Sequence, residues 1–405
     1  MLKHMNPLPP RDLPGDFFRT YDHHKLECTR DLYSMARQSH RTCPVFRSDS
    51  HGGFYVVTRY DDIMEVARNP SVFSSRRGFE VPEHRAPTLI PFHYDPPDAT
   101  HYRRLLNPYF SPQAIVGFRD YVRSIVLHQI ESHQQQGFLD VIADIARPTA
   151  ASTILKIIGL DPDQWLEYTE PYHNLCFRLA PPDVAFRQVY VLSQRLAADV
   201  RHFRKSPIPH TLLADLLSKQ FRGRPLTNEE ISSIIVTLLT AGGETTQASI
   251  GTAVVYLGEN PDQRRRLLDN PDLIPGAVEE FLRLLAAQPS MARTVMTDYV
   301  LAGVKLREGD TVLLSWAAGN VDGAKFPSPF EMDFCRSPNP HLAFGTGIHK
   351  CLGMHLARME IAVCLQTILE KLPNYQIKHD RLRLAPDCSL FFGFESVPIE
   401  FSSEL

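Results

Sequence analysis

The chain has 405 residues, of which 43% are hydrophobic and 22% are charged, proportions typical of a globular protein. Its 43 basic and 46 acidic residues give a formal charge of −3 without a block of one sign, which argues against a nucleic-acid partner. The seven cysteines include no C-x-x-C pair, so neither a disulfide framework nor a zinc site is expected. Residues 1–18 are broken by prolines and lack an apolar stretch, so we expect no signal peptide, no membrane anchor and a location in the reducing cytoplasm.

The first two thirds of the chain are dominated by helical patterns. The stretch "GGFYVVTRYDDIMEVARN" (52–69) predicts a short strand followed by a helix capped near Asp61. Residues 70–97 carry six prolines and little periodicity, which is typical of a lid or a binding loop. Mixed helical patterns then cover residues 98–205 and 210–285.

The last third of the chain adds extended segments. The stretch "DYVLAGVKLREGDTVLLSW" (298–316) predicts two strands around turn residues, and the final 25 residues predict strands again. We find no internal repeat and no Gly/Ser-rich linker that would separate domains. The predicted fold class is therefore mainly α with small β-sheets, in a single domain over residues 1–405.

One predicted helix, over about residues 228–258, is longer and more apolar than the others. Thr227 and Glu230 have the spacing of a capping box at its start. The uncharged runs on either side of Glu244 are shorter than the roughly 18 residues that a membrane span needs, so this helix should lie in the core. The sequence "GGETT" (242–246) interrupts it, either as a kink against a neighbouring helix or as a cleft where glycine lets a ligand approach the backbone.

A cysteine near the C-terminal end, Cys351, lies in the glycine-rich stretch "HLAFGTGIHKCLGMHLARME". Gly345 and Gly347 allow a tight loop before it, and Gly353 precedes a helical pattern. Free amides and the dipole of that helix favour a negative sulfur, as in a metal-ligating thiolate. A nucleophilic cysteine would need a general base, and His349 is poorly placed for that role because it lies only two residues away on a turn. The simpler alternative is an inert thiol in the core.

The stretch "FGTGIHKCLG" (344–353) resembles the haem-binding loop of the cytochrome P-450 superfamily, whose pattern is Phe-x-x-Gly-x-His/Arg-x-Cys-x-Gly. Further stretches resemble the family in the family's order over residues 52–400: "DPPDATHYRRLLNPYFSP", "AGGETT", "EEFLR" with Glu280 and Arg283, "AAGNVD", and "FCR" with Arg336. Glu280 and Arg283 stand one helical turn apart and can form an ion pair, which Arg336 joins in the family. The resemblance implies the P-450 fold, with the long central helix over a haem and the thiolate loop on the opposite face.

The resemblance also implies a role for each matching residue. Cys351 would be the axial thiolate of haem b, and Thr245 with Glu244 would hold the water chain that supplies protons to dioxygen. The remaining haem contacts would be Arg103, Arg293 and His349 at the propionates, together with Phe344, Gly345, Ala241 and Gly353. The sequence departs from the family at Ala99, where many relatives carry a propionate-binding His, and at Val321, where Arg is commonest.

The residues that would contact the substrate are implied by the resemblance alone. The alternative is that they are ordinary residues of the hydrophobic core. The matching positions are Phe79, Leu89, Ile90, Phe92, Thr237, Thr240, Gly242, Gln288, Ser290, Met291, Leu390 and Phe391. The chain has no G-x-G-x-x-G fingerprint, so electrons from NAD(P)H are expected through a separate ferredoxin or flavodoxin-like protein with its reductase. That partner would dock near Arg104 and Lys350, with the arginines 264–266 either joining this face or serving as solvated charge.

The expected function is that of a monomeric monooxygenase that activates dioxygen and hydroxylates or epoxidises a small, largely hydrophobic molecule in bacterial secondary metabolism or catabolism. A peroxide-using or isomerising relative is the nearest alternative, and Glu244 with Thr245 argues against it. A haem sensor is the alternative from another class, and it would be expected to carry an output domain, which the sequence does not reveal.

Overall fold

The computed structural model describes residues 11–82, 88–387 and 389–402. Part of the predicted lid loop (83–87) and Cys388 lie outside the described residues. The helices are α1 (Phe17–Thr20), α2 (Leu26–Arg30), α3 (Leu32–Thr42), α4 (Tyr60–Arg68), α5 (Asp98–Leu106), α6 (Pro112–Ile115), α7 (Arg119–His133), α8 (Arg147–Ile158), α9 (Trp165–Cys176), α10 (Pro182–Lys205), α11 (Leu212–Ser218), α12 (Asn228–Glu259), α13 (Pro261–Asp269), α14 (Ile274–Leu284), α15 (Trp316–Gly319) and α16 (Met354–Lys371).

The strands are short and form small sheets. They are β1 (Val45–Ser48), β2 (Phe54–Val57), β3 (Phe73–Ser74), β4 (Phe138–Asp140), β5 (Gln220–Phe221), β6 (Arg224–Pro225), β7 (Met291–Val295), β8 (Tyr299–Leu301), β9 (Val304–Leu306), β10 (Thr311–Leu314), β11 (Gln376–Ile377), β12 (Arg383–Leu384), β13 (Phe394–Ser396) and β14 (Pro398–Glu400). The five-stranded sheet has the order β1-β2-β10-β7-β3, in which β10 runs parallel to β2 and the other pairs are antiparallel. A second sheet has the order β11-β14-β4. The prediction of a mainly helical protein with small sheets is confirmed.

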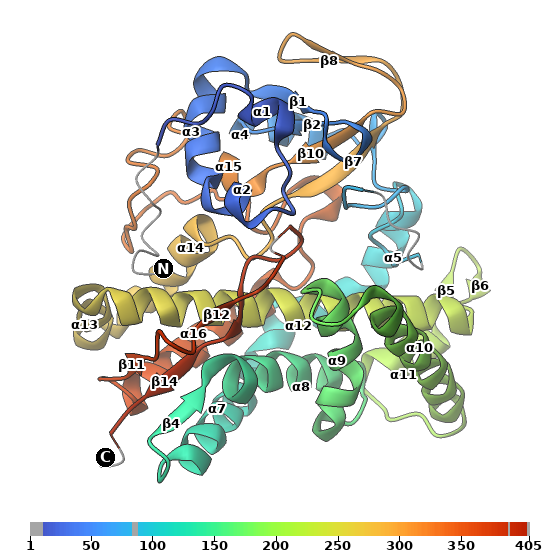
Figure 1. Cartoon of the computed structure of the whole chain (residues 1–405). Helices are drawn as coiled ribbons and strands as arrows, with labels where there is room; N and C mark the ends of the chain where they lie inside the picture. Colours follow the sequence, from blue (N-terminus) through green and yellow to red (C-terminus); the bar gives the residue numbers. More distant parts are fainter. Residues whose placement is uncertain (1–10, 83–87, 388, 403–405) are drawn as a thin grey trace.

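The long helix α12 crosses the middle of the molecule, with the five-stranded sheet and α1 to α4 on one side and α7 to α9 on the other (Figure 1). Its 32 residues span about 48 Å at 1.5 Å per residue. The predicted capping box is present, because the Thr227 side chain accepts from the Glu230 backbone N–H and the Glu230 carboxylate accepts from the Thr227 N–H. Close packing is visible at Gly251, where a Cβ would stand 2.5 Å from the Ile142 side chain.

Two sequence expectations are corrected by the structure. The helix after β2 begins at Tyr60, and Asp61 lies inside its first turn, where no side chain caps the helix. The stretch 298–316 holds three strands rather than two, because β8 and β9 form their own hairpin before β10 joins the large sheet. Ala302 and Gly303 turn that hairpin with positive φ angles, a conformation that the sequence pattern did not distinguish from a strand end.

No helix among the described residues is long and apolar enough to cross a membrane. The buried residues of α12 run along nearly its whole length from Ile231 to Leu257, as expected for a core helix that is apolar on all sides. The candidate functional residues gather around a cavity to which α12, α16 and β7 all contribute lining residues.

Candidate active site

The loop that carries Cys351 is fixed by backbone contacts. The Cys351 N–H donates to the Phe344 carbonyl at 2.8 Å, which closes the loop, and α16 begins three residues after the cysteine with Gly353 as its N-cap residue. Gly347 has φ +68°, and a Cβ there would lie 2.4 Å from the Ala67 carbonyl oxygen. Only glycine fits this position, because the backbone is left-handed and α4 lies directly against it.

Two opposing effects act on the pKa of the Cys351 thiol. Burial raises the pKa of the thiol, while a backbone hydrogen bond at Gly353 and the cationic side chains of Arg103, Arg358 and Lys350 act in the opposite direction. The net shift is upward, so the sulfur is a thiol when it stands alone. A cation at the sulfur would remove the proton, and the surrounding positive charge would stabilise the thiolate so formed.

Three basic side chains lie near this loop without a carboxylate partner. Arg293 on β7 is 4% exposed, its guanidinium donates to the Ala292 carbonyl at 2.7 Å, and burial lowers its pKa to about 10. Arg103 on α5 donates to the Lys350 carbonyl at 2.7 Å, and burial lowers its pKa. Among the described residues, no carboxylate forms an ion pair with either guanidinium within 4 Å. The buried guanidinium of Arg293 and the half-buried one of Arg103 therefore favour an anionic group in the space between them.

His349 lies with these arginines and contacts the lid loop. Its Nε2 is 3.0 Å from the Ser75 hydroxyl oxygen. Burial, followed by the charges of Arg293 and Arg103, lowers the pKa of His349 to about 3, so the imidazole is neutral. The N–H of a neutral imidazole beside two guanidinium groups can donate a hydrogen bond to a carboxylate ligand.

A cavity joins Cys351, the basic cluster and the middle of α12. It encloses about 1960 Å³ of atom-free space, counting the part open to solvent. The predicted haem contacts Arg103, Arg293, His349, Phe344, Gly345, Ala241, Gly353 and Cys351 all line it. So do the predicted substrate contacts Phe79, Leu89, Phe92, Thr237, Thr240, Gly242, Gln288, Met291, Leu390 and Phe391.

Two predicted substrate residues do not line the cavity. Ile90 is 3% exposed and belongs to the apolar cluster around α5 and α11, and its N–H donates to the Ser233 hydroxyl at 3.0 Å. Ser290 is 8% exposed and immediately precedes β7. The loop pattern alone could not distinguish a side chain that faces the cavity from one that faces the core behind it.

The sequence "GGETT" (242–246) was expected to produce either a kink in the long helix or a cleft beside it. In the structure, α12 is continuous through these residues. Gly242 faces Ile154 on α8 at ordinary contact distance, and nothing lies within 4 Å of a Cβ at Gly243. Thr245 lines the cavity, and its hydroxyl donates to the Ala241 carbonyl at 2.7 Å. The structure therefore has a cleft beside a helix that is continuous through these residues.

Glu244 faces away from this cleft. It is 2% exposed, does not line the cavity, and its Oε2 lies 2.8 Å from Nδ1 of His173 on α9. The Gln247 amide also donates to the same oxygen. The acid and the alcohol that are neighbours in sequence thus have different surroundings in space.

An acidic residue that sequence reasoning missed does line the cavity. Glu360 on α16 is 1% exposed, and burial raises its pKa well above the ordinary value, while hydrogen bonds with Thr153 and Thr246 act in the opposite direction. Its Oε1 has no hydrogen-bond partner among the described residues. The sequence feature that could have identified Glu360 is a single carboxylate on the otherwise apolar face of the helix "MHLARMEIAVCL". The cavity also includes Tyr172, Leu175 and Cys176 of α9 and Phe186 and Val189 of α10, which gave no distinctive sequence signal.

Glu280 and Arg283 form a fully buried ion pair behind the loop. The two arginine nitrogens Nε and Nη2 donate to the two carboxylate oxygens at 2.6 and 2.8 Å, and Arg336 Nε adds a third contact at 3.0 Å. Arg283 Nη1 also donates to the Asn320 carbonyl, and the Asn320 side chain accepts from the Leu342 N–H at 2.6 Å. Through Asn320 the ion pair holds the residues that lead into the cysteine loop.

The family model described as Cytochrome P450 matches residues 189–389. The biotin biosynthesis cytochrome P450 of Bacillus subtilis (strain 168) is 30% identical over 392 residues, with 93% of this chain and 97% of that protein covered. The steroid C26-monooxygenase of Mycolicibacterium smegmatis is 28% identical over 380 residues, with 92% of each covered. Among solved structures, cytochrome P450 CREJ in complex with (4-ethylphenyl) dihydrogen phosphate superposes with a TM-score of 0.86 at 26% identity, covering 95% of this chain and 100% of that one.

Proposed function

The chain belongs to the cytochrome P450 family and is a P450 monooxygenase, and from this premise we propose that it hydroxylates or epoxidises a small, largely hydrophobic molecule in bacterial secondary metabolism or catabolism. The observation that carries the proposal is a large, mostly apolar cavity with a cysteine on one wall and two unpaired guanidinium groups at its edge. We further propose that the electrons come from NAD(P)H through a ferredoxin or flavodoxin-like partner and its reductase.

The residues present fit haem, the cofactor of the family. Cys351 would ligate the iron, while Arg103, Arg293 and His349 would hold the two carboxylates, which supply the anions that this buried cluster lacks. Phe344, Gly345, Gly353 and Ala241 would form the walls. When bound, the haem supplies the iron at which dioxygen is activated with two electrons.

We propose Thr245 as the residue that passes protons at the cavity wall. Its hydroxyl donates to the Ala241 carbonyl, which fixes the direction of the O–H and leaves the Oγ1 lone pairs free to accept from a water in the cavity. Glu244 is hydrogen-bonded to His173, so its carboxylate can approach Thr245 only after that hydrogen bond breaks. In this scheme Glu244 restores the proton that Thr245 gives up.

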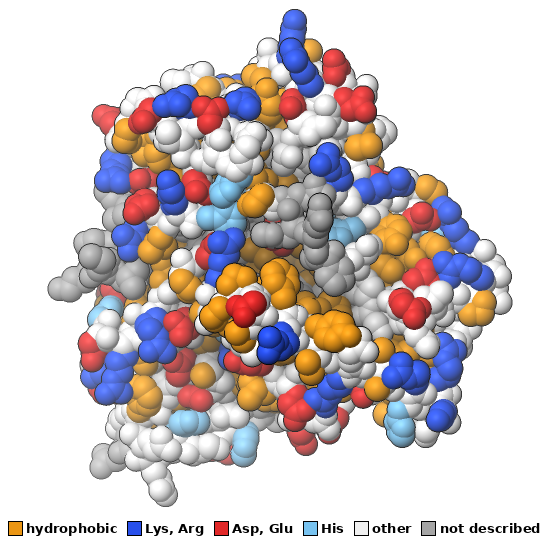
Figure 2. All heavy atoms as spheres, turned by 45° about the vertical axis from the view of Figure 1, so that its right-hand side comes forward, with side chains coloured by type: hydrophobic (Ala, Val, Ile, Leu, Met, Phe, Trp, Pro, Cys, Tyr) orange, Lys and Arg blue, Asp and Glu red, His pale blue; other side chains and the backbone are white. Residues whose placement is uncertain are grey.

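The substrate would be recognised mainly by apolar contact. Phe186 on α10 both lines the cavity and is 49% exposed, and Val184, Tyr190 and Val191 beside it are also exposed. Figure 2 views the side on which α10 lies, and hydrophobic side chains gather near the middle of that face. We propose that a hydrophobic substrate enters along this surface, with Thr237, Thr240 and Gln288 as polar groups that orient it.

The redox partner would approach the face that carries the cysteine loop. Arg104 and Lys350 are exposed there and would attract an acidic protein. The arginines 264–266 suit this role less well, because Arg264 donates to the Tyr375 carbonyl at 2.6 Å and lies over the Tyr375 ring. Part of that charge therefore stabilises the fold locally.

The test is the difference spectrum of the reduced holoenzyme with carbon monoxide. A strongly red-shifted Soret band is expected for the wild type and for Cys335→Ser, which removes an exposed thiol outside the cavity. Cys351→Ser should lose that band and turnover. A red-shifted band that survives Cys351→Ser would contradict the ligand assignment, and an ordinary Soret position in the wild type would contradict the proposed function. Spin-state shifts with terpenoid, aromatic, fatty and macrocyclic compounds would then identify the substrate class.

A further inference from the structure

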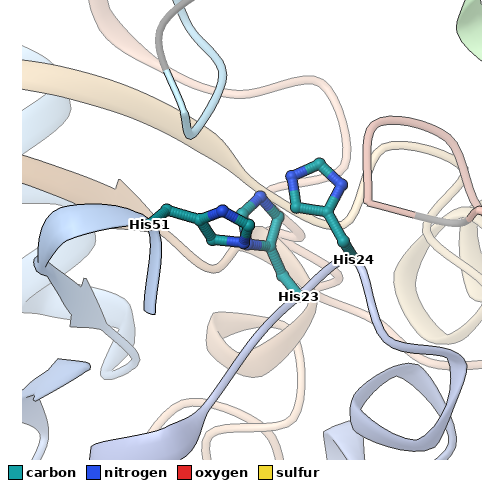
Figure 3. A group of neighbouring side chains, drawn as sticks. All are labelled: His23, His24 and His51. Carbon is teal, nitrogen blue, oxygen red and sulfur yellow. The ribbon is translucent and has the colours of Figure 1, made fainter. Parts of the chain in front are cut away.

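Three histidines gather at a place that the proposed reaction does not use. His23 and His24 precede α2, and His51 lies in the short helix between β1 and β2 (residues 50–52). One ring nitrogen from each residue lies within 4.8 Å of the other two, and Figure 3 shows the three rings turned toward one another. Among the histidine, cysteine, aspartate and glutamate side chains that the structure describes, these three histidines form the group that is close enough to hold one metal ion. None of the three lines the large cavity.

The backbone brings these rings together at a local cost. His51 has φ 53° and ψ 32°, a left-handed conformation that is uncommon for residues other than glycine. The ring centroids of His23 and His24 are 4.3 Å apart, and those of His24 and His51 are 5.0 Å apart. Phe54 covers the group from the sheet side, with its ring 5.6 Å from that of His23. Histidines packed this closely repel one another when they are protonated, so a cation shared by the three rings requires them to be neutral.

His23 provides the clearest sign of a missing partner. Its side chain is 7% exposed, and its Nδ1 is buried without a hydrogen bond among the described residues. A buried, unsatisfied ring nitrogen costs free energy that a bound cation would recover.

Two carboxylates stand behind the other two rings. His51 Nε2 lies 2.8 Å from Asp22 Oδ1, and His24 Nδ1 lies 3.0 Å from Asp387 Oδ2. A carboxylate on one ring nitrogen is usual around metal-ligating histidines. It leaves Nδ1 of His51 free for a metal, whereas Nε2 of His24 lies 2.6 Å from the Val81 carbonyl oxygen and has to give up that contact. The Arg178 guanidinium lies 2.9 Å from Asp387 Oδ2 and 2.9 Å from His24 Nδ1, so the two carboxylates and this guanidinium sum to one negative charge. That balance favours a divalent cation over an anion.

We propose that His23, His24 and His51 bind one divalent transition-metal cation of the zinc class, with Asp22 and Asp387 orienting the rings. Imidazole nitrogens are preferred ligands of such cations, with metal–nitrogen bonds of about 2.0–2.1 Å, so the three nitrogens close in by roughly 1 Å on binding. A water molecule fills the fourth position. The proposal does not depend on haem or on the monooxygenase reaction.

Binding would also release a contact of the lid loop. His24 Nε2 lies 2.6 Å from the Val81 carbonyl and donates to it, while Nδ1 faces Asp387 in the C-terminal part of the chain. A cation on Nε2 takes the place of that hydrogen and leaves the Val81 carbonyl without its donor. The site thus couples the N-terminal segment, the lid loop and the loop that carries Asp387.

The test uses the untagged holoenzyme in its oxidised, ferric state, titrated with Zn²⁺ by calorimetry and with Cu²⁺ by electron paramagnetic resonance, with the haem spectrum recorded before Cu²⁺ is added and subtracted. We expect one Zn²⁺ per chain and a Cu²⁺ signal split by imidazole nitrogens. His51→Ala should weaken Zn²⁺ binding at least about tenfold, and Asp22→Asn by about tenfold. His128→Ala, an exposed histidine on α7, should leave binding unchanged.

The variant His51→Ala is preferred to His23→Ala because His51 is exposed, so its removal should not disturb folding. Haem content and circular dichroism equal to those of the wild type would verify this, and His51→Gln is the second variant should His51→Ala misfold. Absence of Zn²⁺ binding by the wild type would overturn the proposal. So would binding that both His51 variants leave unchanged, because the cation would then be adventitious and held elsewhere.

Discussion

Replacement of Glu280 by glutamine keeps the shape of the side chain and removes its charge. Glu280 is fully buried and accepts five hydrogen bonds, from Arg283 twice, Arg336, Asn339 and the Asp333 N–H. The variant leaves Arg283, which is also fully buried, and the nearly buried Arg336 without an anion, and its amide N–H₂ must face other donors. Breaking one partner out of a buried ion pair costs about 3–5 kcal/mol. We expect the free energy of unfolding to fall by about that amount.

The matched control is Glu279→Gln, one residue earlier on the same helix. Glu279 also pairs with an arginine and a histidine, Arg358 and His341, but its side chain is 27% exposed. Water screens that pair, so the expected loss is about 1 kcal/mol. Guanidinium chloride unfolding, followed by circular dichroism and by the Soret band, measures both variants. Equal losses would refute the argument that burial makes the Glu280 network costly to break.

The remaining predictions concern the cavity and its loop. Gly347→Ala should destabilise the holoenzyme by about 1–3 kcal/mol and lower its haem content, because φ is +68° and Ala67 leaves no space, whereas Gly323→Ala, in an open turn, should change neither. Thr245→Ala should uncouple NAD(P)H consumption from product and raise peroxide release, while Thr252→Ala, on the same helix but outside the cavity, should preserve coupling. Glu360→Gln should flatten the pH dependence of stability: burial raises the pKa of Glu360, so the folded wild type holds a proton that the unfolded chain releases above about pH 4.5. Wild-type stability then falls as pH rises through that window, by up to about 1.4 kcal/mol per unit, and an equal slope in the variant would disprove the assignment.

The side of the cavity that carries Cys351 was predictable because its constraints are local. Gly347 is required by a left-handed backbone, the Cys351 N–H closes a loop of eight residues onto Phe344, and Glu280 reaches Arg283 within one helical turn. Each of these constraints restricts the residue type at a fixed spacing, so it leaves a readable pattern. The participation of Asn320, which links the ion pair to Leu342, depends on chain segments far apart and left no such pattern.

The substrate side was less predictable because it is built by packing between distant helices. Ile90 and Leu89 are neighbours in one loop, but Leu89 lines the cavity and Ile90 lies in the core. The contributions of Tyr172 and Phe186 depend on how α9 and α10 lie over α12, and many apolar residues satisfy that packing equally well. The residue type at these positions therefore predicts that the side chain is buried, but not that it lines the cavity.

The geometry of α12 explains why the predicted acid–alcohol pair is divided in space. Consecutive residues of a helix point about 100° apart, whereas residues four apart share a face. Thr237, Ala241, Thr245 and Ser249 follow this spacing, and all four line the cavity. Glu244 must then point toward the flank of that stripe, where α9 supplies His173 as its partner. In the relay that we propose, a proton from Glu244 has to leave the hydrogen bond with His173 before it reaches Thr245, so this contact would control the supply of protons to the cavity.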